Sequence, residues 1–418
     1  MLSSLANIVM IKELRSKLFF TLMMFAVFRI GVHIPVPGVD ANAIEQLFQS
    51  GSLFGLLDLF AGGALSRFSI FAMSITPYIN ASIILQLLTV VVPSLEKLSK
   101  EGPEGRKKIT QITRYGTVVL GLLQAVGMAY GLRSAMHNPS FVNVMIIALT
   151  LTAGTVLLMW IGEQITEKGI GNGISLIIFA GVVSRLPEGI MVIFQYLKAG
   201  TISILNVLLF VVVAAAMIVF VIAVQQGIRK IPVHYAKRVV GRKMYGGHTS
   251  HIPLKVNQAG VIPIIFASSV LMFPTTIGQF INIEWVKMVT SWFAWGSPLQ
   301  TVLYVLLIIG FTYFYSEISM NIPDMADNMK KYGGYISGVR PGKPTIDYLQ
   351  RIMTRINLAG AIFLALIAIL PNFVVAITNI QGVYFGGTAL LIVVGVALDT
   401  MKQIESLVLM RHYQGFMK

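Results

Sequence analysis

The sequence predicts an all-α membrane protein in which ten transmembrane helices form two pseudo-symmetric, inverted halves of five helices, with one short re-entrant helix. Hydrophobic residues make up 56% of the 418 residues and charged residues only 12%, too few to cover a soluble protein of this size. The apolar residues gather in long continuous runs, which favour helices over the alternating strands of a β-barrel. Two sequence patterns also recur at corresponding runs of each half.

Ten apolar runs are candidates to cross the hydrocarbon layer, which is roughly 30 Å thick and requires about 20 apolar residues in a helix. The fifth run is short for a full span. The first run continues without a small-residue cleavage pattern, so no removable signal peptide is expected. The predicted spans are 18–36, 68–92, 114–132, 141–161, 173–187, 204–224, 258–281, 300–320, 356–377 and 387–403.

Lysine and arginine residues determine the expected orientation of these spans. Most of the 32 basic residues fall in loops on one side of the membrane if the chain starts in the cytoplasm. Basic loops stay on the cytoplasmic side, so both termini are expected there. The net charge of +15 is then explained by topology and by contact with anionic lipid, and by itself does not indicate nucleic-acid binding.

A faint internal duplication relates the two halves. The pattern P-x-I-x-A-S-x-x-L occurs at Pro77–Leu85 and Pro263–Leu271, in the second and seventh spans. The pattern G-x-x-L-x-I-x-x-G-V occurs at Gly173–Val182 and Gly387–Val396, in the fifth and tenth. Because each half holds an odd number of spans, the second half would be inverted, as in many transport proteins. Coincidence of apolar composition remains the alternative. The expected organisation is an N-terminal half over 1–187, a hinge loop over 188–203 and a C-terminal half over 204–418.

The segment over about 52–66 is apolar but cannot form a full span. Asp58 and the pair Gly62 and Gly63 interrupt it, and a glycine costs about 1 kcal/mol inside a helix. A short helix that re-enters from the outer face fits better than an exposed loop. Re-entrant backbone must be buried in protein or line a cavity, so a hollow between the halves is expected. Arg29, inside the first span, is expected to reach outward or to cap an interface.

The spans lack the residues that enzymes and ion-coupled transporters need. Nearly all of the 17 acidic residues lie in loops or at span ends, and no nucleophile has a suitable neighbouring base. His248 and His251 are three residues apart in a loop, where a solvated pair is the ordinary interpretation, so no metal site is predicted. Cysteine is absent, which excludes disulfides and thiolate ligands. These features argue against an enzyme and, less strongly, against an ion-coupled transporter.

Two predicted cytoplasmic loops, at about 225–257 and 321–355, are long for connections between spans. Both are basic and contain tyrosine, proline and glycine. They are either a docking platform for a soluble partner or plain solvated loops, and the residues alone leave both interpretations open.

Distinctive motifs follow one another along nearly the whole chain. The longest is Trp160–Ser175, which reads WIGEQITEKGIGNGIS. The others are Phe28–Gly31, Ile34–Gly38, Gly62–Arg67, Tyr235–Arg238, Pro253–Asn257, Ile262–Pro263, Arg340–Gly342 and Tyr384–Thr388. This ordered set resembles the SecY family, whose members form the channel of the bacterial protein-export translocon.

The resemblance implies a channel between two five-span halves. Unfolded preproteins would cross the membrane through it, and transmembrane segments would leave it sideways into lipid. A plug would close the outer funnel. This plug would include Phe54, Leu56, Leu57, Leu59, Phe60, Gly62 and Gly63. A pore ring would be formed by Ile75, Ile79, Ile174, Ile178, Ile265 and Ile392. The two repeat patterns independently place Ile79 opposite Ile265 and Ile178 opposite Ile392.

The resemblance also implies a lateral gate and a set of partners. The gate would lie between spans two and three on one side and seven and eight on the other, with Gln86 and Asn257 near it. Docking on the cytoplasmic loops would involve Arg238, Arg242, Lys243 and Arg340. The expected partners are SecE, SecG, the ATPase SecA, the translating ribosome, preproteins with a signal sequence, and membrane lipid. SecA or translation would supply the energy, so no cofactor is expected, and the location would be the bacterial inner membrane.

A secondary transporter of small solutes with inverted repeats is the alternative function. It would need a polar site at the membrane midplane, where this chain has isoleucines. An intramembrane enzyme would need a catalytic pair that the sequence lacks.

Overall fold

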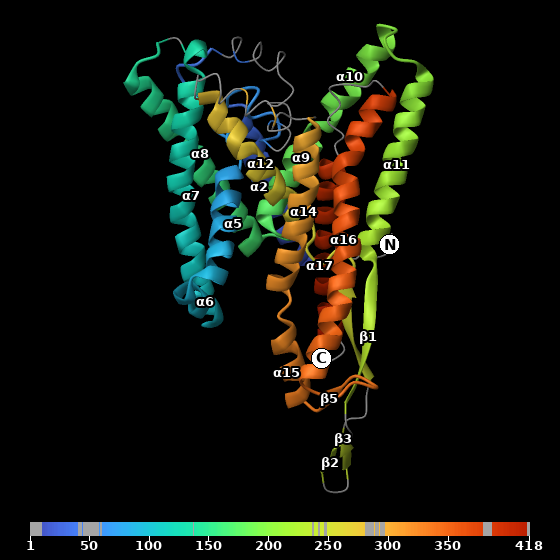
Figure 1. The fold of residues 1–418 in the computed structure, drawn as a ribbon. Coiled ribbons are helices and arrows are strands. Elements are labelled where there is room, and N and C mark those ends of the chain that lie inside the picture. Colours follow the sequence, from blue (N-terminus) through green and yellow to red (C-terminus); the bar gives the residue numbers. More distant parts are fainter. Residues whose placement is uncertain are drawn as a thin grey trace.

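The structure is a computed structural model, and most of it consists of long helices with a few short strands at one end (Figure 1). It describes residues 11–40, 44, 58, 61–136, 138–235, 238–240, 243–245, 249–280, 288, 292, 297–378 and 387–415.

The helices of the two halves follow the predicted spans. The N-terminal half contains α2 (Lys12–Val32), α5 (Thr76–Val91), α6 (Pro93–Lys100), α7 (Pro103–Gly131), the short 3-10 helix η1 (Arg133–Ala135), α8 (Phe141–Lys168), α9 (Gly173–Ser184) and α10 (Leu186–Lys198). The C-terminal half contains α11 (Ile204–Gln226), α12 (Ile262–Phe280), α14 (Pro298–Ser319), α15 (Ile322–Lys331), α16 (Lys343–Thr378) and α17 (Gly387–Gly415). Each predicted span overlaps one of these helices.

Among the described residues, six helical stretches are long and apolar enough to cross a membrane unaided. They contain α7, α8, α9 with α10, α11, α14 with α15, and α16. A seventh is added if α5 and α6, which meet at an angle of 100°, form one broken span. Apolar side chains are exposed along several of these helices, for example Leu208 of α11 and Leu366 of α16, as expected for surfaces that face lipid.

Two predicted boundaries are wrong. The second span was expected to begin at 68, but residues 62–75 form turns and α5 begins only at Thr76. Phe68 and Ser74 have positive φ, which interrupts a helix, and Pro77 then suits the first turn of α5. The segment 188–203 was expected to be a hinge loop, but α10 occupies it up to Lys198, with Pro187 and Glu188 in its first turn.

The helices of the two halves pack in matching patterns. In the N-terminal half α7 contacts α5 and α8, α8 contacts α9, and α2 contacts both α8 and α9. In the C-terminal half α14 contacts α12 and α16, α16 contacts α17, and α11 contacts both α16 and α17. These contacts correspond pair by pair if α2, α5, α7, α8 and α9 are matched to α11, α12, α14, α16 and α17, whereas the further contact of α5 with α8 has no such counterpart. This correspondence is the one that the repeated sequence patterns predict.

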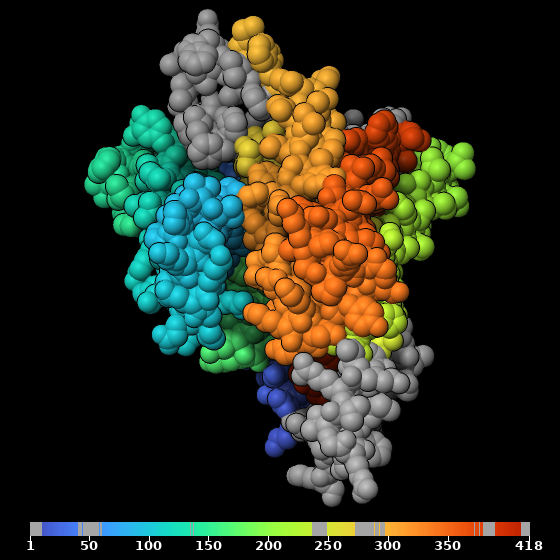
Figure 2. Space-filling model, turned by 60° about the horizontal axis from the view of Figure 1, so that its bottom comes forward, coloured from blue at the N-terminus to red at the C-terminus, as the bar shows by residue number. Residues whose placement is uncertain are grey.

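The halves meet along two lines of contact. On one side α12 packs against α5 and α7, and elsewhere α9 packs against α17. The first line is called the seam below. Figure 2 shows the blue surface of α5 and α6 directly beside the orange surface of α14 to α16.

The segments predicted to be long loops contain strands and a helix. β1 (Ile228–Tyr235) pairs antiparallel with β4 (Thr249–Lys255) and with β5 (Gly334–Tyr335), in the order β4-β1-β5. β2 (Arg238–Val240) and β3 (Lys243–Tyr245) form a separate pair. Because β5 belongs to the second segment and β1 to the first, the two segments form one folded unit. Figure 1 shows this unit at the same end of the molecule as α6, α15 and the end of α17.

Three hydrophobic cores hold these parts together. The first core joins the N-terminal half to α12 and α17, and the second lies within the C-terminal half. The third core lies under the β4-β1-β5 sheet and includes Ile231, Leu254, Met329 and Leu349. It therefore fixes the sheet against α15 and the start of α16.

Candidate functional site

All six isoleucines predicted for the pore ring belong to the first hydrophobic core. Five of them lie in α5, α9, α12 and α17, and Ile75 directly precedes α5. Ile75, Ile178 and Ile392 are buried, with exposed fractions of 1%, 5% and 1%. Ile79, Ile174 and Ile265 are partly buried and pack against the same core. The fold therefore brings together residues that are up to 317 positions apart, from both halves.

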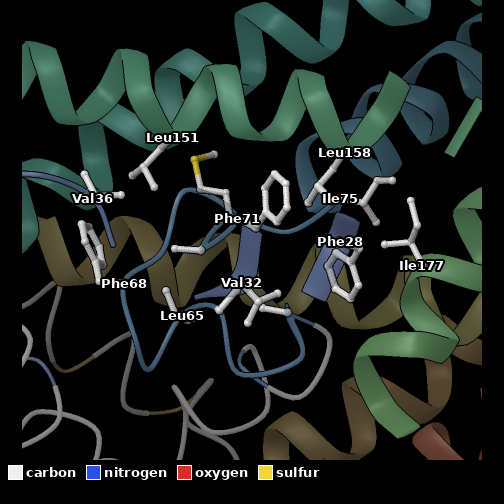
Figure 3. Packing of buried hydrophobic residues seen from close by; sticks show 14 of the residues in the cluster. Phe28, Val32, Val36, Leu65, Phe68, Phe71, Ile75, Leu151, Leu158 and Ile177 are labelled. Atoms are coloured by element: carbon white, nitrogen blue, oxygen red, sulfur yellow. The ribbon is translucent and has the colours of Figure 1, made fainter. Parts of the chain in front are cut away.

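The turns over 62–75 fill the part of this core that lies beside the isoleucines. Phe68 and Phe71 are almost fully buried, and Phe71 stacks on Phe28 of α2 with ring centroids 6.1 Å apart. Figure 3 shows Phe71, Phe28 and Ile75 close together between α2 and α8. Gly154 of α8 allows this close packing, because a side chain there would collide with the carbonyl of Ile70. The turns are thus a packed part of the protein interior.

Gly62 and Gly63 adopt the backbone conformation for which glycine is suited. Their φ angles are +65° and +87°, so the predicted interruption by this pair is present. At Gly62, an added Cβ would also lie 2.8 Å from the Cα of Gly181 in α9. The other residues predicted for the plug lie outside the described residues, namely Phe54, Leu56, Leu57, Leu59 and Phe60.

The contact with Gly181 places the segment next to the isoleucines of α9. Ile174, Ile178 and Gly181 are spaced by four and three residues, so they lie on one face of the helix. Gly181 lies roughly 4.5 Å further along the helix axis than Ile178, because an α-helix rises about 1.5 Å per residue. The segment around Gly62 therefore sits against the same face of α9, one turn beyond the isoleucine cluster.

Charged side chains hold this segment, which sequence reasoning did not predict. Arg29 of α2 donates from Nη1 to the Gly62 carbonyl at 3.0 Å and to the Ser184 hydroxyl at 2.9 Å. The carboxylate of Asp58, 1% exposed as a side chain, pairs with Arg185 at the end of α9. Its Oδ1 also accepts the backbone N–H groups of Leu65 and Ser66, each at 2.9 Å. Arg29, in the last turn of α2, thus binds at the interface of α2, this segment and α9, which is the second of the two roles expected of it.

Three further residues extend this charged cluster, namely Glu188, Arg67 and His33. Glu188 of α10 pairs with Arg185 at 2.9 Å and with Arg67 at 3.6 Å. Arg67 in turn lies 2.6 Å from Nε2 of His33. The one sequence signal for the cluster is the presence of Arg29 and Asp58 inside otherwise apolar segments, since isolated charges at membrane depth need partners.

The two residues predicted for the lateral gate lie on opposite sides of the seam. Gln86 of α5 is partly buried, and Asn257, just before α12, is 6% exposed. Asn257 donates from Nδ2 to the Gly260 carbonyl at 3.1 Å. Among the hydrogen bonds of the described residues, none joins Gln86 to Asn257.

The residues predicted for docking are spread over the folded unit at the other end. Arg340 is exposed in the connection between β5 and α16, where its carbonyl accepts the Thr345 hydroxyl at 2.8 Å. Gly342, with φ +103°, completes this turn. Arg238 lies in β2 and Lys243 in β3, while Arg242 lies outside the described residues. Figure 1 shows β2 and β3 farther from the helices than β5.

The described residues hold no group of three or more histidine, aspartate or glutamate side chains arranged to bind a metal ion. The interior of the candidate site is a set of apolar side chains with a charged cluster at its edge.

Comparison with known proteins identifies the family. A family model described as SecY matches residues 69–401. The chain belongs to the SecY family. A protein translocase subunit SecY of Halalkalibacterium halodurans is 50% identical over 433 residues, which cover 100% of both chains.

Solved structures share the fold of this SecY family member. One, described as "The structure of a protein conducting channel", has a TM-score of 0.68 at 17% identity and covers 94% of this chain and 92% of that one. Another, described by the statement that the plug domain of the SecY protein stabilises the closed state and maintains a membrane seal, has a TM-score of 0.66 at 18% identity with the same coverage. The helical architecture predicted from the sequence is confirmed by these matches.

Proposed function

We propose that this chain is the central channel subunit of a bacterial Sec translocon, which passes unfolded preproteins across the membrane and releases transmembrane segments sideways into lipid. The observation that carries this proposal is the presence of the six isoleucines, from both halves, in or against one hydrophobic core, beside a turn segment that Arg29 and Arg185 bind. Membership of the SecY family and the relatives' name, protein translocase subunit, support it. The chain is proposed to act without catalysis.

The chemistry of the isoleucines suits a seal around a moving polypeptide. Aliphatic side chains neither select a substrate by charge nor coordinate ions, and a narrow apolar constriction gates by dewetting. The packed isoleucines would form the constriction, and the segment over about 52–66 would be the plug beside it. A solute transporter would instead place polar groups at this point of the inverted repeat.

The seam is the proposed lateral gate. It is the line where α12 contacts α5 and α7, and no chain connection crosses it directly. Separation of these helices would open the interior toward lipid. Gln86 and Asn257 lie on its two sides, where polar groups would meet a signal sequence as it leaves the pore.

The folded unit formed by β1, β4, β5 and α15 is the proposed docking platform. Its own hydrophobic core would keep this unit rigid when a partner binds. Arg340 is exposed on its surface. SecA and the ribosome would bind there, SecE and SecG would bind along the spans, and no cofactor is required. Basic residues of α6, α7 and α15 lie at the same end, which supports a cytoplasmic position for this end and for both termini in a ten-span topology of the bacterial inner membrane.

Deletion of residues 54–65 tests the channel proposal. We expect the shortened chain to insert and fold but to conduct ions at rest, because the seal loses one of its two parts. The measurement is conductance across a planar bilayer without any polypeptide cargo, beside the unaltered chain. An unselective leak that appears only after the deletion supports a protein channel. Saturable uptake of a small solute, with no change in leak, would instead support a transporter.

A further inference from the structure

The strongest unexplained feature of the molecule is the buried ion pair between Asp58 and Arg185. Asp58 belongs to the proposed plug, whereas Arg185 follows the last residue of α9. A buried carboxylate is strongly unfavourable without a partner, so a chain maintains one only where its charge is fully compensated. Here Arg185 pairs with Oδ2 of the carboxylate through Nη2, and the N–H groups of Leu65 and Ser66 donate to Oδ1, while Nε of Arg185 has no hydrogen-bond partner in the described structure.

We propose that Asp58 and Arg185, assisted by Arg29, form a clasp that holds the plug against α9, and that this clasp opens separately from the seam. The proposal rests on the channel function above and assigns positioning roles that the function alone does not require. The clasp comprises Arg29, Asp58, Gly62, Ser184 and Arg185, and every one of its contacts lies within the N-terminal half.

The contacts of the clasp differ from those of the seam in where they lie relative to the two halves. The seam and the isoleucine cluster join the two halves, so movement of one half against the other disturbs both. The same movement leaves the clasp intact, because α2, α9 and the plug move together. Opening sideways to lipid and opening across the membrane are therefore distinct steps, and the second requires the clasp to break.

Asp58 and Arg185 have different remaining partners when the other residue is replaced. Single and double substitutions are therefore expected to have different effects. Replacing Arg185 leaves a buried carboxylate without its cation, although two N–H groups remain. Replacing Asp58 with asparagine is milder, because Arg185 keeps Glu188 and the asparagine oxygen can still accept both N–H groups. The double variant Asp58→Asn with Arg185→Gln removes both charges at once. It should therefore hold the plug better than Arg185→Gln alone.

Cysteine labelling measures the clasp directly, because the natural chain contains no cysteine. Ala64 lies between the clasp contacts and is 0% exposed, so Ala64→Cys reports whether the plug is seated. The full-length chain is tested in membrane vesicles with a maleimide that cannot cross the membrane and is supplied from the outer face. We expect slow labelling of Ala64→Cys alone and labelling faster by roughly tenfold or more with Arg185→Gln, the effect of an uncompensated buried charge.

Conservative and matched variants complete the experiment. Arg185→Lys keeps the charge and should label slowly. Lys198→Gln removes a positive charge from the neighbouring α10, where Lys198 contacts only Phe194 among the described aromatic rings, and should also label slowly. The double variant should label more slowly than Arg185→Gln. This order supports the clasp even if export assays were to contradict the channel function, because labelling does not depend on transport.

Two results would overturn the clasp. One is slow labelling of Arg185→Gln, equal to that of the parent. The other is a double variant that labels at least as fast as Arg185→Gln, which would show that the two residues act independently. If Arg185→Gln fails to accumulate in the membrane, normal accumulation of the double variant still identifies the unpaired carboxylate as the cause, whereas loss of both variants contradicts the assignment.

Discussion

Replacing Ile392 with asparagine is expected to open the resting channel to ions. Ile392 is 1% exposed within the core that joins the two halves. Loss of one buried aliphatic side chain costs a packed state about 2 kcal/mol or more, and an unpaired amide adds to this cost. Because about 1.4 kcal/mol changes an equilibrium tenfold, the open fraction should rise roughly tenfold or more. The measurement is ion leak through the reconstituted chain without cargo.

Two controls separate a seal from ordinary packing. Ile392→Leu keeps the volume and apolar character, so its leak should remain close to that of the unaltered chain. Ile367→Asn makes the same change at a fully buried position in the second core, away from the isoleucine cluster. It should reduce the amount of folded protein without raising leak per folded molecule. Equal leak from the Ile367 and Ile392 variants would remove the special role of the cluster.

Replacing Arg340 with glutamate is expected to abolish export driven by SecA. Arg340 is exposed, and within the described structure only its backbone carbonyl is engaged. The substitution should therefore leave the fold intact. A planar guanidinium suits an acidic patch on a partner, and loss of one side of such a buried pair costs about 2–5 kcal/mol of binding. The assay is preprotein import into vesicles, together with SecA binding.

Lys343→Glu is the matched control for this prediction. Lys343 is also exposed, three residues away, and begins α16, where a glutamate is favourable for the helix. Both variants change the net charge equally, so a role in topology alone predicts the same result for both. A protease map of the cytoplasmic segments should be unchanged in each. Normal export by the Arg340 variant would contradict a docking role and indicate that the charge of Arg340 serves only to orient the spans.

The sequence predicted the helices well because each span must satisfy its own backbone hydrogen bonds and be apolar throughout. The two repeated patterns aligned Ile79 with Ile265 and Ile178 with Ile392, and the family resemblance implied that these four residues belong to one pore ring. These four residues share one core in the structure.

The parts that were missed depend on contacts between distant residues. Arg29 and Asp58 appeared as isolated charges, and nothing in the pattern indicated that Arg185 and Ser184, more than a hundred residues later, would meet them. The strands β1 and β5 were missed for a similar reason. β5 has only two residues and pairs with β1 across about a hundred residues, so no local pattern indicated this pairing.

The most direct test of the proposed channel is to locate a polypeptide while it crosses the membrane. Single cysteines are placed at Ile79, Ile178, Ile265 or Ile392 in this cysteine-free chain, and at Leu208 of α11, which is 60% exposed toward the surroundings. A preprotein with one cysteine is held halfway by a folded domain at its end. We expect disulfide cross-links to all four isoleucine positions and none to Leu208. Cross-links to Leu208 alone, or none to any isoleucine position, would contradict a path through the isoleucine cluster.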